Sequence, residues 1–314
     1  MRKIEYQSSL SCDNCGHDGF KILHKFKSDY YLSDYFNKYS FDGNLDLPLT
    51  LVRCVRCSVV RQNPVFKGEF LERLYASYGN LSFTQRDLGK AESKFAFTVK
   101  MIKAHCPEKH NILDLGARDG AFMYIMQQKG YNAFGVEMNS DLVSRYNELK
   151  LSGMFKGNIE NYRDLASLYR KAQAQIIHMN DVLEHMIRPY ELLRNIAKIQ
   201  NEGDYLILNQ MNIKSPGYKI FKKHWYFIHA QHIYYFDSHQ LETFLKTLDY
   251  SLVIKHEIPL IKSLSLIPGE FKKLVKDYFS RFKATYFSSS QEKQWYAANR
   301  PKLFDYSFSI YKKT

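Results

Sequence analysis

A short apolar strand, a glycine-punctuated turn and an apolar helix follow one another between residues 111 and 126. Asn111–Leu115 reads Asn-Ile-Leu-Asp-Leu, and Gly-Ala-Arg-Asp-Gly and an apolar segment follow it directly. About one βα unit later, Gly135-Val-Glu137 ends the next predicted strand with a carboxylate. A tight turn at the carboxyl end of a parallel strand lets backbone N–H groups approach a ligand, and an acid after the next strand can hold ribose hydroxyls. The pattern predicts an α/β chain with a nucleoside-cofactor site.

Strand-like and helix-like segments alternate from Asn111 to about His256. Apolar runs predict strands at Ile112–Leu115, Ala133–Val136, Ile176–Met179, Tyr205–Leu208 and Leu252–Ile254. Helical patterns cover Ala121–Gln128, Leu142–Lys150, Pro189–Ile199 and Ser238–Leu248. This alternation predicts a doubly wound, mostly parallel sheet with helices on both faces.

The chain divides into three predicted parts. Residues 1–75 would form a small metal-bound module, residues 76–110 a helical linker, and residues 111–314 the main domain. Alternating apolar residues at 304–311 predict a last, antiparallel strand, and a helical insertion over residues 262–300 would precede it.

The glycine turn differs from the fingerprint that binds nicotinamide dinucleotides. Its spacing is Gly116-x-x-x-Gly120, and the third glycine of that fingerprint is missing. This argues against a nicotinamide dehydrogenase. Glu137 has two interpretations: a ribose-binding acid, or a carboxylate that merely caps the edge of its strand.

Two later segments complete a resemblance to a known family. Gly157-Asn-Ile-Glu160 follows a predicted helix, and Ile176-Ile-His-Met-Asn-Asp-Val-Leu-Glu-His185 runs from a strand through a loop into a helix. Together with Asp114-Leu-Gly116 and Glu137, they resemble the class I S-adenosylmethionine-dependent methyltransferases over about residues 85–256.

The resemblance implies a Rossmann-like sheet of seven strands and S-adenosylmethionine as cofactor. It implies ten cofactor-binding residues: Asp114, Gly116, Arg118, Gly120, Glu137, Met138, Asn158, Ile159, Asn180 and Asp181. Asn158 and Ile159 would lie beside the adenine ring. The family's usual Gly-Cys-Gly centre is Gly-Ala-Arg here, and Arg118 would pair with the cofactor carboxylate or point to solvent.

Four of the five cysteines form two Cys-x-x-Cys pairs, Cys12 with Cys15 and Cys54 with Cys57. Such knuckles in a cytosolic chain favour a metal over disulfides. Four thiolates make a closed tetrahedral site, so we expect structural Zn²⁺ rather than a catalytic metal. Redox use or an iron–sulfur cluster are the alternatives, and Cys106 is expected to be an ordinary thiol.

Further motifs resemble those of the sugar methyltransferases, a group that includes C-methyltransferases of nucleotide-linked deoxysugars. They are the four-cysteine module, the Asn-Pro and Leu-Tyr-x-x-Tyr motifs that follow it, and an aromatic segment rich in histidine at 224–236. In the C-methyltransferases a Tyr-x-Glu-His stretch supplies the base. His232 matches that histidine, but Gln231 replaces the glutamate and His229 the tyrosine. The departures favour O-methyl transfer over enolate formation, with N-methyl transfer or an altered C-methylation still open.

The methyl group of a sulfonium is already activated, so the enzyme must align an acceptor and remove its proton. A histidine with a near-neutral pKa suits that task. His232 is the predicted general base, followed by His229 and His185, and Tyr78 would orient the acceptor. A structural role is the alternative for His232, for His185, which would then brace its loop, and for Tyr78.

The net charge of +13 raises nucleic acid as a partner. Because Lys and Arg form no dense block, a lysine-coated enzyme or a cleft for a phosphate-bearing sugar also fits, and no stable nucleic acid complex is expected.

No apolar run is long enough to span a membrane and the start lacks the core of a signal peptide, so a cytoplasmic location is expected. The amphipathic stretch 269–283 would touch a membrane surface, its own domain or a sister subunit. An RNA methyltransferase and an inactive binding module remain the alternative functions, and the sequence does not set the oligomeric state.

Overall fold

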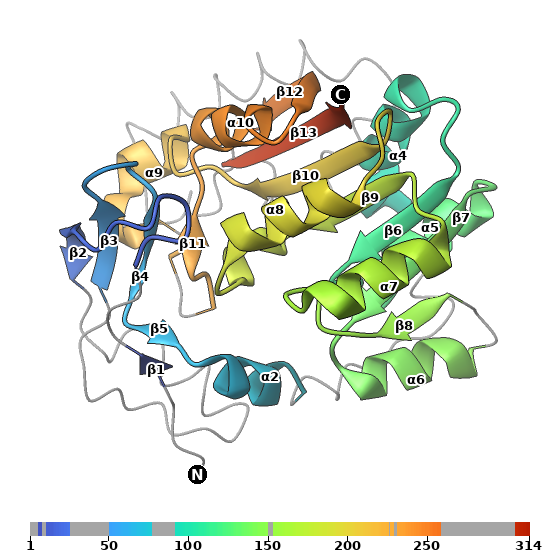
Figure 1. The fold of residues 1–314 in the computed structure, drawn as a ribbon, viewed down its shortest axis with the longest axis horizontal. Helices are drawn as coiled ribbons and strands as arrows, with labels where there is room; N and C mark the ends of the chain where they lie inside the picture. Colours follow the sequence, from blue (N-terminus) through green and yellow to red (C-terminus); the bar gives the residue numbers. More distant parts are fainter. Residues whose placement is uncertain are drawn as a thin grey trace, which may run out of the picture.

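The computed structural model describes residues 6–7, 11–25, 50–76, 92–149, 153–225, 227–228, 231–258 and 305–314 (Figure 1). Two larger sheets organise this part of the chain. None of the helices in these ranges is long and apolar enough to cross a membrane.

The larger sheet has seven described strands in the order β12-β13-β10-β9-β6-β7-β8. Their bounds are β6 (Asn111–Leu115), β7 (Asn132–Glu137), β8 (Met154–Lys156), β9 (Ile176–Asn180), β10 (Tyr205–Met211), β12 (Tyr250–Ile258) and β13 (Tyr306–Lys313). The five strands from β10 to β8 are parallel, and β13 runs antiparallel between β10 and β12. The predicted doubly wound, mostly parallel sheet and its antiparallel last strand are therefore confirmed.

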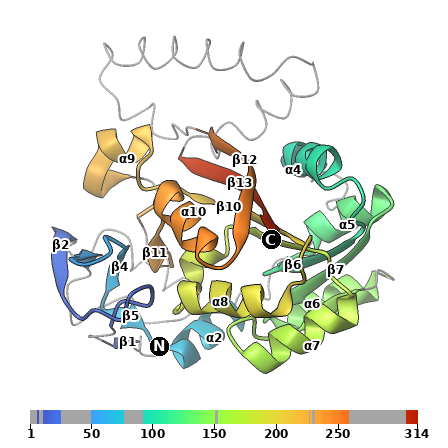
Figure 2. The same ribbon diagram turned by 45° about the horizontal axis from the view of Figure 1, so that its top comes forward.

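Helices cover both faces of this sheet (Figures 1 and 2). They are α4 (Glu92–His105), α5 (Ala121–Gln128), α6 (Ser140–Glu148), α7 (Tyr162–Ala172), α8 (Pro189–Ile199) and α10 (Ser238–Lys246). Adjacent strand residues alternate between two cores, as the pleat requires. Leu113 and Ile177 join α7, α8 and α10, whereas Ile112 and Ile176 join α4, α5 and α6.

The smaller sheet has four described strands in the order β11-β4-β3-β2. Their bounds are β2 (Phe20–Lys25), β3 (Thr50–Cys54), β4 (Val60–Asn63) and β11 (Tyr234–Tyr235). A short pair, β1 (Tyr6–Gln7) with β5 (Val65–Phe66), and helix α2 (Gly68–Ala76) complete the N-terminal region. The edge strand β11 of the smaller sheet comes from the later part of the chain. Buried residues of this region, among them Val59 and Phe70, share one apolar cluster with α8 and α10.

Sequence analysis did not predict strand β8 of the main sheet or helix α7, which packs on that sheet. The segment 157–160 thus follows strand β8 rather than a helix directly. Helix α7 begins where the Asn161 side chain accepts hydrogen bonds from the backbone N–H groups of Arg163 and Asp164. The predicted insertion 262–300 and the stretch 269–283 lie outside the described residues, and the three predicted domain boundaries stay predictions.

Candidate active site

The turn between β6 and α5 is built from backbone geometry that glycine permits. Gly116 has φ +71°, and its N–H and that of Ala117 both donate to the Val136 carbonyl at 2.9 Å. A Cβ atom on Gly116 would lie 2.8 Å from Val182 Cγ2. The turn therefore places its backbone against the loop after β9, and only glycine keeps the intervening space open.

Glu137 ends β7 beside this turn. Its Oε2 accepts a hydrogen bond from the Arg118 N–H and its Oε1 one from the Asn139 N–H, each at 2.9 Å. Burial raises the pKa of this carboxyl group, and the backbone donors oppose the rise. The carboxylate is thus fixed in position, and lone pairs that these donors leave unused can accept from a hydroxyl group.

A cavity of about 450 Å³ opens at the carboxyl ends of β6, β7 and β9. This is where ligands bind in doubly wound sheets, and the volume suits a nucleoside-sized ligand. Eight of the ten predicted cofactor contacts line it: Asp114, Gly116, Arg118, Glu137, Met138, Ile159, Asn180 and Asp181. The other two do not. Gly120 supports the start of α5 at φ +73°, and the Asn158 side chain donates to Glu72 at 3.3 Å.

A buried acid–histidine pair forms one wall of the cavity. Asp114 Oδ1 lies 2.7 Å from His178 Nδ1, and the His178 ring stacks on Phe122 at a centroid distance of 3.9 Å. His178 Nε2 has no hydrogen-bond partner among the described residues, although the side chain lines the cavity. Sequence analysis missed His178, because a histidine within a five-residue apolar strand resembles an ordinary core residue.

The predicted catalytic histidines His185 and His232 lie side by side next to the cavity. The 3₁₀ turn η2 (Leu183–His185) carries His185, which lines the cavity. The rings of His185 and His232 are T-shaped, with centroids 4.8 Å apart. His232 is buried and does not line the cavity itself. His229 and Tyr78 lie outside the described residues.

Backbone carbonyls hold both rings. His185 Nδ1 lies 3.0 Å from the Gln231 carbonyl oxygen, and His232 Nδ1 lies 2.8 Å from that of Phe227. Because a carbonyl oxygen only accepts, each Nδ1 must carry the proton, and a neutral ring then has its lone pair on Nε2. Burial lowers the pKa of His185, which favours the neutral ring.

Glu184, to which sequence analysis gave no role, completes this group. Its side chain is fully buried, and neither carboxylate oxygen has a hydrogen-bond partner among the described residues. Burial raises the pKa of Glu184 well above its usual value, and the negative charge of Asp181 adds to the rise. The sequence feature that could have identified Glu184 is its position between Asp181 and His185 in the loop after β9.

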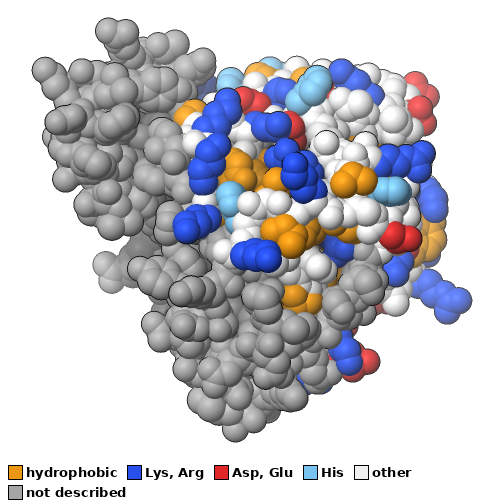
Figure 3. All heavy atoms as spheres, turned by 90° about the vertical axis from the view of Figure 1, so that its left-hand side faces the viewer, with side chains coloured by type: hydrophobic (Ala, Val, Ile, Leu, Met, Phe, Trp, Pro, Cys, Tyr) orange, Lys and Arg blue, Asp and Glu red, His pale blue; other side chains and the backbone are white. Residues whose placement is uncertain are grey.

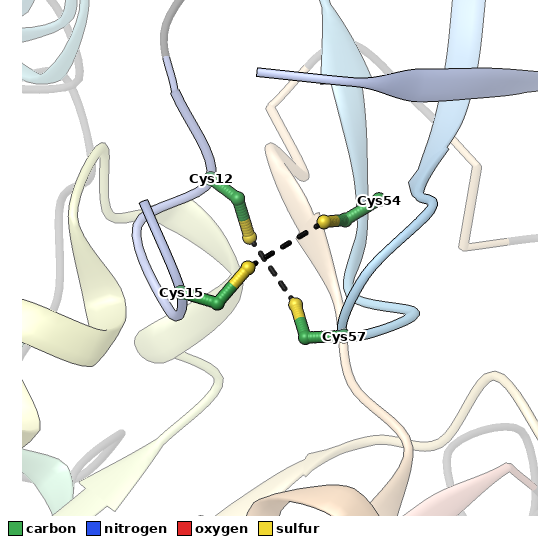
Figure 4. Close-up of side chains that lie close together, drawn as sticks. All are labelled: Cys12, Cys15, Cys54 and Cys57. Carbon is green, nitrogen blue, oxygen red and sulfur yellow. Dashed lines mark hydrogen bonds between the residues drawn. The ribbon is translucent and has the colours of Figure 1, made fainter. Parts of the chain in front are cut away.

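The four cysteine side chains of the N-terminal region converge from two loops (Figure 4). Cys12 Sγ lies 3.4 Å from Cys57 Sγ, and Cys15 Sγ lies 3.7 Å from Cys54 Sγ. Sulfurs around a tetrahedral zinc ion are about 3.8 Å apart, given Zn–S bonds of about 2.3 Å. All five cysteines are free thiols, so the geometry fits a metal rather than disulfides.

The first cysteine loop also docks on helix α8. Asp13 Oδ2 accepts from the Tyr190 N–H at 2.7 Å and from the Glu191 N–H at 3.3 Å, which caps the helix. The Arg194 guanidinium donates to the Asn14 carbonyl at 2.8 Å. The cysteine cluster is thereby fixed relative to the main sheet.

Comparison with known proteins agrees with this architecture. Residues 83–254 match the family model described as a methyltransferase domain. A search of curated proteins found no significant match.

Three solved structures illustrate the similarity in fold, and each is distant in sequence. A SAM-dependent methyltransferase from Archaeoglobus fulgidus is 15% identical (TM-score 0.46, 73% of this chain, 100% of that chain). Magnesium protoporphyrin IX methyltransferase from Synechocystis PCC 6803 is 13% identical (0.44, 78% and 94%). An O-methyltransferase family protein from Burkholderia thailandensis is 10% identical (0.47, 79% and 63%). Likenesses this distant do not bear on the acceptor.

The family match therefore decides the assignment. It spans more than half of the chain and includes the glycine turn, Glu137 and the loop after β9. The chain belongs to the methyltransferase-domain family, and the protein is a class I S-adenosylmethionine-dependent methyltransferase with an α/β, Rossmann-like fold.

Proposed function

We propose that the protein transfers a methyl group to a hydroxyl oxygen of a sugar, either nucleotide-linked or a precursor of a surface polysaccharide. The observation that carries the proposal is the layout of the cavity. The glycine turn, Glu137 and His185 all line it, and His232 packs against His185. The turn and Glu137 suit a nucleoside, and a histidine in the same cavity suits an acceptor that must lose a proton.

The ten residues named above keep their proposed cofactor roles, eight of them directly at the cavity. Glu137 would accept hydrogen bonds from both ribose hydroxyls, and the Gly116 turn would admit the methionine end. When bound, S-adenosylmethionine would supply an activated methyl group on a sulfonium and leave as a neutral thioether. The acceptor O–H would give up its proton as its oxygen takes the methyl group. His232 or His185 would take the proton on Nε2, and His229 and Tyr78 remain candidates for the acceptor side.

We further propose that Cys12, Cys15, Cys54 and Cys57 hold a structural Zn²⁺ ion. The sulfur spacing supports this, and the closed four-thiolate set leaves no position for a substrate. Free thiols persist in reducing compartments, which supports a cytoplasmic location. The metal would fix the N-terminal sheet, whose edge strand β11 lies two residues from His232.

The surface charge supports an acceptor that carries phosphate. On the face viewed in Figure 3, basic side chains outnumber acidic ones and surround a few apolar groups. Exposed lysines on β2, on α9 (Pro216–Phe221) and on the adjoining turn η3 (Lys222–His224) are Lys21, Lys25, Lys219, Lys222 and Lys223. A positive surface of this kind raises the local concentration of anionic substrates.

Methyl-labelled S-adenosylmethionine tests the proposal directly. The purified protein would be incubated with nucleotide sugars, unlinked sugars and bulk RNA in parallel, and we expect label in a nucleotide sugar. Label in RNA alone would replace the sugar with the alternative acceptor. No S-adenosylmethionine binding at millimolar concentration would instead indicate an inactive module.

A pair of histidine variants tests the proposed base. His232→Ala should abolish turnover and leave cofactor affinity within about twofold, because the buried ring is not among the residues that line the cavity. His239→Ala is the matched control, since this exposed histidine lies on the surface of α10. Unchanged turnover in His232→Ala would remove His232 from the reaction.

A further inference from the structure

Three side chains of types that bind metals converge where His185 lines the cavity. Ligand atoms of Glu184, His185 and His232 all lie within 4.8 Å of one another. Groups that share one metal ion at about 2.1 Å lie about 3–4 Å apart, so a small inward movement would bring all three into contact with an ion. Asp181 adds a second negative charge close to Glu184 and also lines the cavity.

The burial of Glu184 makes this convergence informative. The side chain is fully buried, and both of its oxygens lack a hydrogen-bond partner among the described residues. A buried carboxylate is strongly destabilising unless it is paired or coordinates a metal. A bound cation would satisfy both oxygens.

The two histidines are oriented as metal ligands usually are. Each donates its Nδ1 proton to a backbone carbonyl, that of Gln231 for His185 and that of Phe227 for His232. A second hydrogen bond of this type fixes the tautomer and turns the basic Nε2 toward the ion.

The backbone holds the three residues in register across both sheets. The Ile233 N–H donates to the Glu184 carbonyl at 2.7 Å, and the Gln62 N–H donates to the Ile233 carbonyl at 2.8 Å. The segment with His232 is therefore fixed to η2 on one side and to β4 on the other. Such a frame supplies the fixed ligand geometry that a metal site requires.

We propose that Glu184, His185 and His232 bind one divalent transition-metal cation beside the cavity, where His185 lines it. Two imidazoles and a carboxylate suit Mn²⁺, Fe²⁺, Co²⁺ or Zn²⁺, whereas Mg²⁺ and Ca²⁺ prefer oxygen ligands throughout. Three protein ligands leave open positions, and His185 borders the cavity, so acceptor oxygens can complete the sphere.

The inference deepens the proposed function, on which its choice of acceptor rests. Open metal positions favour an acceptor with two neighbouring hydroxyl oxygens, as in a sugar diol. In the metal-bound enzyme the two histidines are ligands rather than proton acceptors, and the acceptor proton passes to water. Loss of turnover in His232→Ala fits both roles, so only a metal measurement separates them.

Titration with MnCl₂ tests the site without any acceptor. The probe is Mn²⁺ because it binds thiolates weakly and so does not report on the four cysteines. With the full-length protein, loss of the free-Mn²⁺ signal in electron paramagnetic resonance should saturate at one ion per chain. Glu184→Gln and His232→Gln should each weaken binding about tenfold or more. The controls Glu202→Gln and His239→Ala change exposed residues and should match the wild type.

Two further readouts keep the test decisive. S-adenosylmethionine binding by each variant shows that it is folded, and Mn²⁺ should raise the Tm of the wild type but not of Glu184→Gln. Absence of saturable Mn²⁺ binding by folded wild-type protein, or equal binding by both ligand variants, would overturn the metal site. Mn²⁺ binding without methyl transfer to any sugar would refute only the proposed acceptor, and metal-independent transfer to a sugar would refute only the part of the metal in the transfer.

Discussion

Gly116→Ala should weaken S-adenosylmethionine binding, because the new Cβ both strains the turn and displaces a side chain that lines the cavity. Gly116 has φ +71°, a conformation that costs an L-residue about 1–2 kcal/mol. Its new Cβ would also lie 2.8 Å from Val182 Cγ2, so the Val182 side chain, which lines the cavity, must move. Overpacking of this kind adds about 1–3 kcal/mol. We expect affinity to fall at least tenfold, which corresponds to about 1.4 kcal/mol.

Gly130→Ala is the matched control. Gly130 has φ +86°, no atom lies within 4 Å of the position that a Cβ would take there, and it follows the far end of α5 from the cavity. Both variants should lose about 1 kcal/mol of unfolding free energy from the backbone, measured by urea denaturation. Calorimetry should show Gly130→Ala within twofold of wild-type affinity. Equal affinities in the two variants would refute the assignment of the Gly116 turn to the cofactor.

Three other predictions follow from single contacts. Glu137→Gln should weaken S-adenosylmethionine binding about 10–100-fold in calorimetry, because charged acceptors make hydrogen bonds of about 1.5–3 kcal/mol, and wild-type affinity would exclude Glu137 from the ribose. Asp13→Ala should lower the unfolding free energy by about 1 kcal/mol through the lost cap of α8, whereas Asp13→Asn should keep most of it; equal losses would contradict a capping role. Burial raises the pKa of Asp305 to about 6, so the folded protein binds the extra proton below that pH. Stability should therefore fall by up to about 3 kcal/mol as pH rises from about 4 to about 6.5, and Asp305→Asn should lack this slope in urea unfolding measured across that range.

Sequence periodicity predicted the main sheet well because its elements are long and strongly patterned. The bounds of α5 and α8 agree with the predicted Ala121–Gln128 and Pro189–Ile199. The three-residue edge strand β8 is too short to show a period, and its place depends on tertiary contacts that a local pattern does not contain. Helix α7 does carry a helical pattern, with Leu165, Ala166, Tyr169 and Ala172 buried on one side, and sequence analysis overlooked it.

In the candidate site, too, sequence analysis found the local features and missed the contacts between distant parts of the chain. The glycine turn and Glu137 are local features of one βα unit, so their spacing alone placed them at one cavity. The partnership of Glu184 with His232 depends on the pairing of β11 with β4, which joins residues far apart in sequence. The role of His178 likewise depends on the neighbouring strand that carries Asp114. No spacing rule reports such contacts.

The small sheet has a consequence for synthesis on the ribosome. Strand β4 acquires its outer partner only when Tyr234–Tyr235 has been translated, long after β2 and β3 have emerged. Until then the nascent N-terminal region exposes an unpaired edge, which invites pairing with other chains. A fragment cut at residue 75 would keep that open edge permanently, and early metal loading would be its main protection before the later strand arrives.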